Sequence, residues 1–342
     1  MQIIVTGSLG YDYIMDFGGR FADRIMPDKI HQLSLSFLVD KLSKQYGGTG
    51  ANIAYTLKLL GLDPLLLACA GDDFDLYKKH LTSHGILTQG ITVQKDSTTS
   101  SYFVITDQDD NQIGSFYIGA MKYAKSLSIM DHLEGGRQVR STRRDSFQAN
   151  EKVKPFVIIA PNDPIAMKNY VKECRSQRLP YLYDPAFQIA TFSPDELKEG
   201  IEGAALFIGN DYEIALVEKC LGISHEELLR LTPVVITTLG AKGSIIETRK
   251  ESIHIQPAKP KNNSDPTGAG DAFRAGFLAG YLRAVNSRPA LELTSDELLA
   301  CGQMGSVAAV YTVEKYGTQT HTFTKKEFIA RYKANYGQTI SL

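Results

Sequence analysis

The stretch from Asp265 to Asp271 combines residue types that could bind an anion and activate a hydroxyl group. It reads Asp-Pro-Thr-Gly-Ala-Gly-Asp and leads into an apolar pattern with helical spacing. Gly268, Ala269 and Gly270 lack bulk, so their backbone N–H groups can approach a ligand closely. The N-terminus of the following helix adds unpaired N–H groups and partial positive charge, which favour an anion such as a phosphate.

Asp271 would lie in the first turn of that helix, beside the anion site. A carboxylate there can orient and deprotonate an attacking hydroxyl group, while the N–H groups stabilise charge on a transferring phosphoryl group. The simpler alternative is a capped helix with an acidic residue in its first turn. Two glycines flanked by two aspartates exceed what capping requires, and the stretch therefore predicts a phosphoryl-transfer site.

A second group of residues could hold a substrate with several hydroxyl groups. Gly47 and Gly48 belong to a run of small residues that ends at Asn52, whose amide can both donate to and accept from hydroxyls. Asp12 follows the first predicted strand, and a carboxylate can accept hydrogen bonds from two adjacent hydroxyls. Taken alone, a flexible loop and an ordinary turn would explain these residues better.

Two further motifs directly follow predicted strands, which is where α/β sheets bind their ligands. Asn210 and Glu213 come after the strand predicted at 206–208, and N-capping by Asn210 is the simpler explanation. The turn from Thr238 to Gly243 follows the strand predicted at 234–237. As a bare pattern this turn is weak, and it would also fit a hairpin.

These motifs, in this order, resemble the ribokinase-like, or PfkB, kinase family, which includes adenosine kinase. The Asp-x-Thr-Gly-Ala-Gly-Asp signature is highly specific in that family, and the resemblance covers nearly the whole chain. It implies that Asp271 is the catalytic base and that Gly268–Gly270 form the anion hole. In many members the residues that match Asp265 and Thr267 help to hold a monovalent cation, such as K⁺.

The resemblance also gives expected roles to the remaining motifs. It implies that sugar hydroxyls are held by Asp12, Gly47, Gly48 and Asn52. It implies that the ATP-binding residues include Asn210, Thr238, Gly240 and Gly243. Mg²⁺ normally keeps several waters, so Glu213 would organise this ion through water rather than bind it directly. ATP and Mg²⁺ are therefore the expected cofactors.

The sequence identifies the acceptor of the phosphoryl group less precisely than it identifies the reaction. Ribokinases usually carry Asn where this chain has Gly10, which argues against ribose. The segments 116–121 and 160–164 look like those of bacterial nucleoside kinases, which implies substrate contacts by Met121 and Asn162. The aromatic and methionine side chains at 116–121 could sandwich a nucleobase, or they could simply pack a lid against the core.

The expected function is transfer of the γ-phosphoryl group of ATP to the 5′-hydroxyl of adenosine or a related nucleoside. Such an enzyme is a phosphotransferase with an alcohol acceptor. The nearest alternative is a sugar kinase acting on ribose, a fructose-like sugar or another carbohydrate. A different class is a non-catalytic nucleotide-binding sensor, but loss of Asp271 would be expected there. A dehydrogenase is disfavoured, because Gly7 and Gly10 do not form a G-x-G-x-x-G fingerprint.

Short apolar runs alternate with helical patterns and predict an α/β fold with a central, mainly parallel sheet. Strands are predicted at 3–6, 65–68, 156–160, 181–183, 206–208 and 234–237, and helices at 51–60, 73–84, 165–177, 212–221 and 271–283. The resemblance implies a ribokinase-like three-layer α/β/α core within a single kinase domain over 1–342.

Two segments, at about 12–39 and 98–117, break this alternation. Period-two patterns at 12–17 and 29–39, and again at 98–105 and 112–117, predict half-buried antiparallel strands. These strands could form a small β-sheet that acts as a lid. The segment at about 134–154 is basic with few apolar residues, which favours a solvated, partly disordered insertion over a contact patch.

The composition limits the partners that the protein could have. The 342 residues carry a formal net charge of −1, so no overall basic field suggests a nucleic acid or an anionic membrane as a partner. The four cysteines form no CxxC pair, and free buried thiols are the simplest expectation. The N-terminus does not read as a signal peptide, so we expect a cytoplasmic protein. A monomer and a homodimer fit the sequence equally well.

Overall fold

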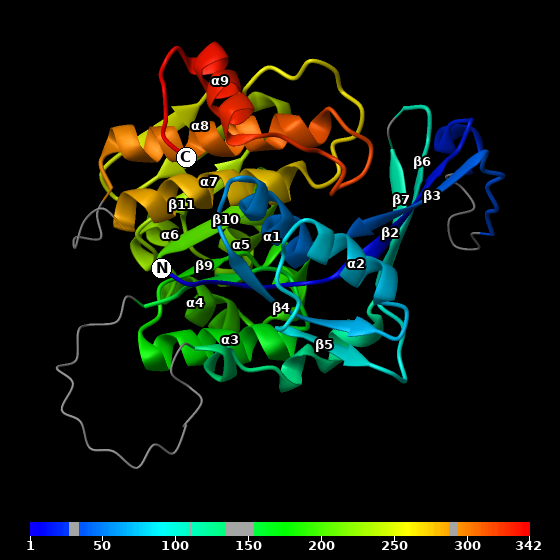
Figure 1. The fold of residues 1–342 in the computed structure, drawn as a ribbon, viewed down its shortest axis with the longest axis horizontal. Helices are drawn as coiled ribbons and strands as arrows, with labels where there is room; N and C mark the ends of the chain where they lie inside the picture. The colour runs from blue at the N-terminus through cyan, green and yellow to red at the C-terminus, as the bar shows by residue number, and fades with distance from the viewer. Residues whose placement is uncertain (27–33, 110, 134–153, 287–292) are drawn as a thin grey trace.

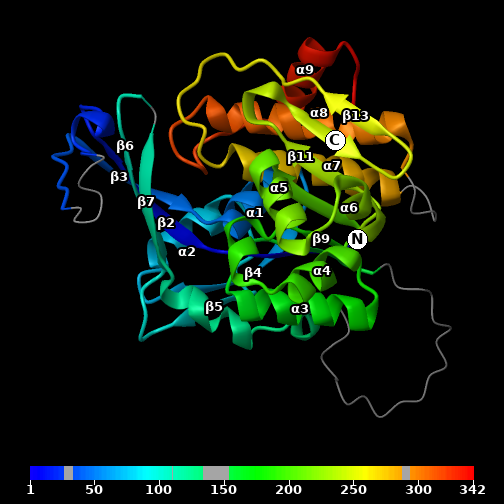
Figure 2. The ribbon, with the colours of Figure 1, turned by 180° about the vertical axis from the view of Figure 1, so that it is seen from behind.

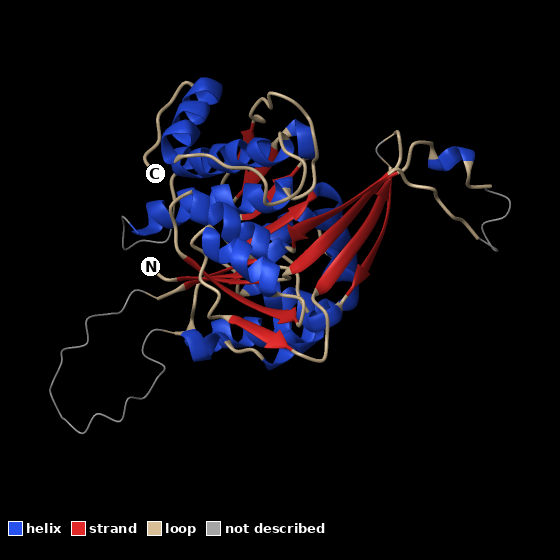
Figure 3. Cartoon of the chain, turned by 45° about the vertical axis from the view of Figure 1, so that its right-hand side comes forward, coloured by secondary structure: helices blue, strands red, loops and turns tan. Residues whose placement is uncertain are grey.

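The computed structural model describes residues 1–26, 34–109, 111–133, 154–286 and 293–342. Within these residues, nine strands form a central sheet in the order β13-β12-β11-β10-β9-β8-β1-β4-β5. Neighbouring strands from β11 to β5 run parallel, whereas β12 and β13 add antiparallel pairs at one edge. A smaller sheet of four strands stands to one side of the main body (Figures 1 and 3). The predicted mainly parallel sheet is therefore confirmed.

All six predicted core strands are present, with small shifts at their ends. The strands of the central sheet are β1 (Ile3–Thr6), β4 (Pro64–Gly71), β5 (Ile91–Gln94), β8 (Phe156–Ile159), β9 (Tyr181–Tyr183), β10 (Leu206–Asn210), β11 (Val235–Thr238), β12 (Ser244–Glu247) and β13 (Ser252–Ile255). Ile3 and Val5 of β1 pack in one hydrophobic cluster, and Ile4 packs in another on the opposite face. Because both faces are buried, such strands read as continuous apolar runs.

Helices cover both faces of the central sheet and give the expected three layers. The layer on the Ile3 face contains α1 (Thr49–Leu59), α2 (Asp75–Ser83), α7 (Ala269–Asn286) and α8 (Ser295–Val313). The opposite layer contains α3 (Pro164–Gln177), α4 (Pro194–Glu202), α5 (Asp211–Leu221) and α6 (His225–Leu231). The C-terminal helix α9 (Lys325–Tyr336) packs outside α8, as Figure 1 shows, and Figure 2 gives the view from behind.

The second sheet, which we call the lid sheet, has the strand order β3-β2-β6-β7. Its strands are β2 (Gly10–Asp16), β3 (Lys41–Gly47), β6 (Ser100–Thr106) and β7 (Gln112–Tyr117). The pair β6–β7 is antiparallel as predicted. β2 pairs antiparallel with β3, which was not predicted, and β2 and β6 join in parallel. β7 is exposed along its whole length rather than half-buried.

The prediction of a strand at 29–39 is wrong for residues 34–39, the part of this segment that the structure describes. Residues 34–39 form no strand, and the partner of β2 is β3 at 41–47 instead. Phe37 packs against Phe17 and Phe21 with ring centroids 5.0 Å apart in each case. Its apolar side chain is therefore satisfied by a local aromatic cluster without strand pairing. Residues 27–33 of that prediction, and 134–153 of the basic segment, lie outside the described residues.

Short 3₁₀ helices connect several elements near the lid and the sheet edge. They are η1 (Phe21–Asp23), η3 (Gly119–Ser126), η4 (Ile129–His132), η5 (Ala186–Thr191) and η6 (Gly240–Lys242). In the described part of the chain, no helix is long and apolar enough to cross a membrane. All four cysteines are free thiols, and Cys220 alone among them is only partly buried.

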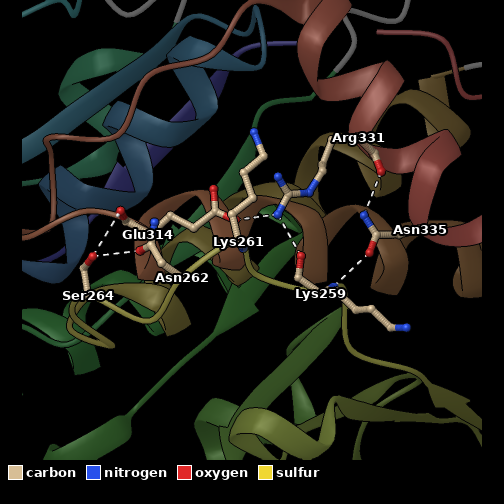
Figure 4. Close-up of polar contacts among 7 residues, drawn as sticks. All are labelled: Lys259, Lys261, Asn262, Ser264, Glu314, Arg331 and Asn335. Carbon is tan, nitrogen blue, oxygen red and sulfur yellow. Dashed lines mark hydrogen bonds and ion pairs between the residues drawn. The ribbon is translucent and has the colours of Figure 1, made fainter.

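The loop that leads into Asp265 is held by contacts with α9 and with the C-terminal end of α8 (Figure 4). Arg331 forms an ion pair with Glu314 at 2.5 Å, and both side chains are about nine-tenths buried. Arg331 also donates to the carbonyl of Lys259 at 2.7 Å, and Glu314 accepts from the backbone N–H of Lys261 at 2.5 Å. These contacts fix the path of residues 259–264 and hence the start of α7.

Replacing Arg331 with Met is expected to lower the free energy of unfolding by about 3 kcal/mol, because Glu314 would remain buried without its cation. The value lies at the lower end of the range for such pairs, since Lys261 N–H still donates to Glu314. Urea denaturation followed by circular dichroism measures this loss. Arg230→Met is the matched control, because the Arg230–Glu226 pair is well exposed and should contribute well under 1 kcal/mol. Equal losses in the two variants would contradict the prediction.

Candidate active site

Asp271 lies in the first turn of α7, where the sequence predicted it. The Nδ2 atom of Asn52 in α1 donates to Asp271 Oδ2 at 2.8 Å. Burial raises the pKa of Asp271 to about 6, against the opposing effects of the Arg274 charge and the Asn52 hydrogen bond. The carboxylate is therefore mostly deprotonated at neutral pH yet remains basic enough to accept a proton.

Asn52 is held on its other side by a loop that the sequence did not indicate. Its Oδ1 atom accepts from Thr318 Oγ1 at 3.0 Å and from Gln319 Nε2 at 2.8 Å. Tyr77 in turn contacts Gln319 at 2.5 Å. Asn52 was expected to hold sugar hydroxyls, but in this structure it connects Asp271 to residues 318–319. Thr318 and Gln319 carry no motif, so only the fold brings them to the site.

A left-handed turn at Gly268, with φ of +79°, begins α7. Asp265 closes this turn, because its Oδ1 accepts from Thr267 N–H at 2.9 Å and its Oδ2 accepts from Gly317 N–H at 3.0 Å. Gly270 is exposed, and its N–H lies in the first helical turn, where N–H groups lack a partner within the helix. The N–H of Ala269 is not free, because it donates to Pro266 O at 3.1 Å. Of these two donors at the start of α7, the N–H of Gly270 is therefore the one available to a ligand.

Arg274 is a site residue that sequence reasoning missed. Its guanidinium forms a buried ion pair with Asp184, which follows β9, at 2.5 Å. Burial alone would lower the pKa of Arg274, but the charges of Asp184, Asp271 and Glu213 raise it. The available signal was a single charge within the apolar helix pattern 272–282.

Asp12 lies in the lid strand β2 and is 8% exposed. Burial raises its pKa to about 7, and the negative charges of Asp271 and Asp265 add to this effect. A Cβ atom at Gly47 would overlap the Asp12 carboxylate. Gly48 has φ of +91°, and a Cβ there would lie 2.7 Å from Leu9 Cα. Gly47 therefore lets β3 approach Asp12 closely, and Gly48 lets the chain pass close to the backbone of residues 8–10.

The two motifs expected to bind ATP lie side by side at the carboxyl ends of β10 and β11, where Asn210 and Thr238 are register partners. Asn210 and Glu213 form a capping box, each accepting from the other's backbone N–H at 2.8 Å. N-capping by Asn210 is thus observed. Gly240 and Gly243 both have positive φ in the turn between the antiparallel strands β11 and β12, so the hairpin alternative is also observed.

Met121 and Asn162, which were expected to contact the substrate, are both buried. Met121 is in η3 and is 3% exposed, so it packs in the interior. Asn162 follows β8 and is fully buried; its Oδ1 accepts from Asp163 N–H, while its Nδ2 has no hydrogen-bond partner among the described residues. A buried amide without a partner is costly, and a ligand group would relieve that cost.

An aromatic pair connects the lid sheet to the core. Phe116 of β7 lies 6.0 Å from Phe187 of η5, measured between ring centroids, and both side chains remain substantially exposed. Tyr117 is 52% exposed. Phe187 was not predicted from the sequence, because an isolated aromatic residue in a loop carries no pattern.

Comparison with known proteins places this site within a family. The family model for pfkB family carbohydrate kinases matches residues 12–325. A nucleoside kinase of Methanothermobacter thermautotrophicus is 29% identical over 340 residues, which are 98% of this chain and 97% of that protein. The structure of Burkholderia thailandensis nucleoside kinase in complex with inosine is 28% identical, with a TM-score of 0.83 over 98% of this chain and 99% of that one. Its ligand-free form gives a TM-score of 0.74 at 29% identity over 96% and 99% of the two chains.

The chain belongs to the pfkB family of carbohydrate kinases, and its core has the ribokinase-like fold. It is a nucleotide-binding phosphotransferase with an alcohol acceptor. The family, the fold and this class of activity are confirmed as the sequence predicted them.

Proposed function

We propose that the protein transfers the γ-phosphoryl group of ATP to the 5′-hydroxyl of adenosine or a related nucleoside, with residues 1–342 acting as one kinase unit. The observation that carries this proposal is the arrangement around Asp271. A carboxylate with a pKa of about 6 lies beside the exposed backbone of Gly270 in the first turn of α7. Asp12 of the lid sheet lies close enough for the Asp271 charge to raise its pKa.

In the proposed reaction, the ribose hydroxyls hydrogen-bond to Asp12 and to the backbone at Gly47 and Gly48. Asp271 takes the proton of the 5′-hydroxyl as its oxygen attacks the γ-phosphorus of ATP. The bond between the γ-phosphorus and the bridging oxygen breaks, and ADP leaves with that electron pair. The N–H groups of Gly268 and Gly270 donate to the phosphoryl oxygens in the transition state. The N–H of Ala269 joins them by exchanging its hydrogen bond to Pro266 O, which is 3.1 Å long, for one to a phosphoryl oxygen.

The nucleotide would lie along Thr238, Gly240, Gly243 and Asn210. When bound, Mg²⁺ would neutralise phosphate charge. Glu213 fits a water-mediated role toward this ion, because one of its oxygens caps α5 and the other has no hydrogen-bond partner within the described residues. Asp265 and Thr267 would help to hold K⁺; the Asp265 oxygens each accept one N–H and keep further lone pairs.

Two observations favour a nucleoside over a simple sugar. The similar proteins reported above are named nucleoside kinases. The exposed ring of Phe116 in the lid sheet, beside the exposed ring of Phe187, offers a stacking surface that a nucleobase could use.

A coupled ADP-release assay over adenosine, inosine, guanosine, cytidine, ribose and fructose, with and without K⁺, tests the proposal. We expect kcat/KM to be highest for a purine nucleoside and higher with K⁺ than without it. A higher value for ribose or fructose would establish a sugar kinase instead. Measurable ATP binding with no turnover on any acceptor would indicate a nucleotide sensor.

Asp12→Asn is expected to raise KM for the nucleoside about 10- to 100-fold while changing kcat little. At about pH 8.5, above its pKa of about 7, Asp12 is a carboxylate, and the substitution weakens its hydrogen bonds to substrate hydroxyls. Hydrogen bonds to a charged group contribute about 1.5–3 kcal/mol each. Steady-state kinetics at saturating ATP separates the two constants. Asp16→Asn in the same strand is the control, because the Asp16 side chain is 43% exposed and contacts Lys41 only at 3.9 Å. A loss confined to kcat would remove Asp12 from substrate binding.

A further inference from the structure

Arg274 lies one helical turn beyond Asp271 on the same side of α7. Helical side chains lean toward the N-terminus of their helix, so the guanidinium reaches back to the first turn. The contact at Gly270 shows this directly, because a Cβ atom built there would lie 2.8 Å from Arg274 Nη1. Nη1 is thus next to the backbone that forms the anion site.

The edge of the guanidinium that carries Nε and Nη2 faces Asp184. Nη2 donates to Asp184 Oδ1 at 3.0 Å, while Nε lies 2.5 Å from Asp184 Oδ2 in an ion pair that lacks hydrogen-bond geometry. Asp184 is completely buried, and the guanidinium has little freedom to rotate away. Among the hydrogen bonds of the described residues, Nη1 makes none. A planar, always charged donor is therefore fixed along one edge while its free nitrogen faces the phosphate-binding turn.

We propose that Arg274 is a further catalytic residue whose Nη1 donates to the phosphoryl group as it passes from ATP to the acceptor. Asp184 is a positioning residue that holds the guanidinium in this orientation. The inference rests on the proposed function, since it assumes that phosphoryl transfer takes place at the N-terminus of α7. No bond is made or broken by Arg274; it stabilises the negative charge on the transferring group.

The surrounding charges agree with this role. The negative charges of three carboxylates, Asp184, Asp271 and Glu213, raise the pKa of this one guanidinium. A cation within this acidic group would offset the repulsion that an incoming triphosphate meets. The arrangement also explains why residue 270 is glycine, because a side chain there would displace a guanidinium that Asp184 holds in place.

Two other roles for Arg274 compete with this proposal. In the first, the Arg274–Asp184 pair serves only to hold the fold together. In the second, Arg274 affects the reaction only by shifting the pKa of Asp271. The double variant Asp184→Asn/Arg274→Gln tests the first, because it replaces the pair with neutral side chains of similar size. It avoids leaving one buried charge alone. Arg274→Lys is the second variant, since it keeps the charge but loses the fork of N–H donors. The pH dependence of kcat tests the indirect effect.

We expect the double variant to bind ADP, which lacks the γ-phosphate, within about threefold of wild type. Its kcat should fall about 10³-fold, which is the lower end of the effect of a phosphate-contacting arginine. Arg274→Lys should lose about 10- to 100-fold. Both losses should persist at pH 9, where Asp271 is deprotonated in every variant. Nucleoside affinity, measured by calorimetry, should be unchanged.

The proposal would be overturned if both variants kept kcat within threefold of wild type. It would also be overturned if their activity returned at pH 9, or if ADP affinity fell in step with kcat. Asp271→Asn, assayed in parallel, separates this inference from the proposed function. If Asp271→Asn is inactive while the Arg274 variants are active, only the role of Arg274 fails. If Asp271→Asn is fully active, the proposed base is wrong.

Discussion

Asp271→Asn is expected to reduce kcat by about 10²- to 10⁴-fold, which is the usual contribution of a general base. The substitution keeps the shape of the side chain, and its amide oxygen can still accept from Asn52 Nδ2. What it removes is the ability to take a proton from the attacking hydroxyl. Steady-state ADP release at saturating ATP and nucleoside measures kcat directly.

The pH dependence of the wild-type enzyme should report the same group. Because burial raises the pKa of Asp271 to about 6, kcat should be constant above about pH 7 and should fall about tenfold per unit below pH 6. Ligands can shift this value in the complex, so kcat/KM should be measured as well. An acidic limb that disappears in Asp271→Asn would assign the titration to this residue.

The raised pKa also has a consequence for stability. The folded state binds the Asp271 proton more tightly than the unfolded chain, so its contribution to stability is full below the unfolded pKa. That contribution is lost as the pH rises through about 6. Asp271→Asn should therefore be at least as stable as wild type at pH 7.5. A clear loss of stability would mean that Asp271 holds the fold together rather than serving catalysis.

Asp195→Asn is the matched control for Asp271→Asn. Asp195 is also an acidic residue in the first turn of a helix, α4, but it lies on the opposite layer of the molecule. If a first-turn acid served only the helix dipole, both substitutions should have similar small effects, below about 1 kcal/mol on stability. Near-normal turnover of folded Asp271→Asn would remove the residue from the proposed role.

Gly268→Ala is expected to reduce kcat about 10²- to 10³-fold, the effect of disturbing one donor of an anion hole. An Ala at φ of +79° is strained, and its Cβ would lie 2.9 Å from Thr318 Cβ and Cγ2. Thr318 cannot easily move away, because its Oγ1 contacts Tyr46 O at 2.7 Å and Asn52 Oδ1 at 3.0 Å. A displacement of Thr318 would therefore also shift Asn52 and, through its hydrogen bond, the Asp271 carboxylate.

Gly222→Ala is the control variant, because it introduces backbone strain at a positive φ without a steric clash of the new Cβ atom. Gly222 ends α5 with φ of +65°, and a Cβ there meets nothing within 4 Å. We expect it to lose stability of roughly 1–2 kcal/mol from the left-handed backbone alone, without loss of kcat. Differential scanning calorimetry and the ADP-release assay give the two quantities. Equal kcat for the two variants would show that the turn at Gly268 does not position the phosphoryl group.

Local patterns accounted for most of the core. The helix predicted at 165–177 begins where Asp163 caps the N–H groups of Ile165 and Ala166, and the structure has α3 at 164–177. By contrast, α8 was not predicted, because its middle is buried on most sides and lacks a polar face. The period-two pattern at 29–39 misled for a related reason, since apolar alternation also arises when residues such as Phe37 join an aromatic cluster.

The residue types within Asp265–Asp271 were enough to predict an anion site with an adjacent acid, because backbone conformation and helix polarity are local properties. They could not show that Asn52 donates to Asp271, or that Thr318 and Gln319 fix Asn52 across more than 260 residues of sequence separation. The Arg274–Asp184 pair depends in the same way on the packing of α7 against the carboxyl end of β9. Motifs name the reacting groups, whereas their orientation and their pKa values come from burial and from neighbours that only the folded chain brings together.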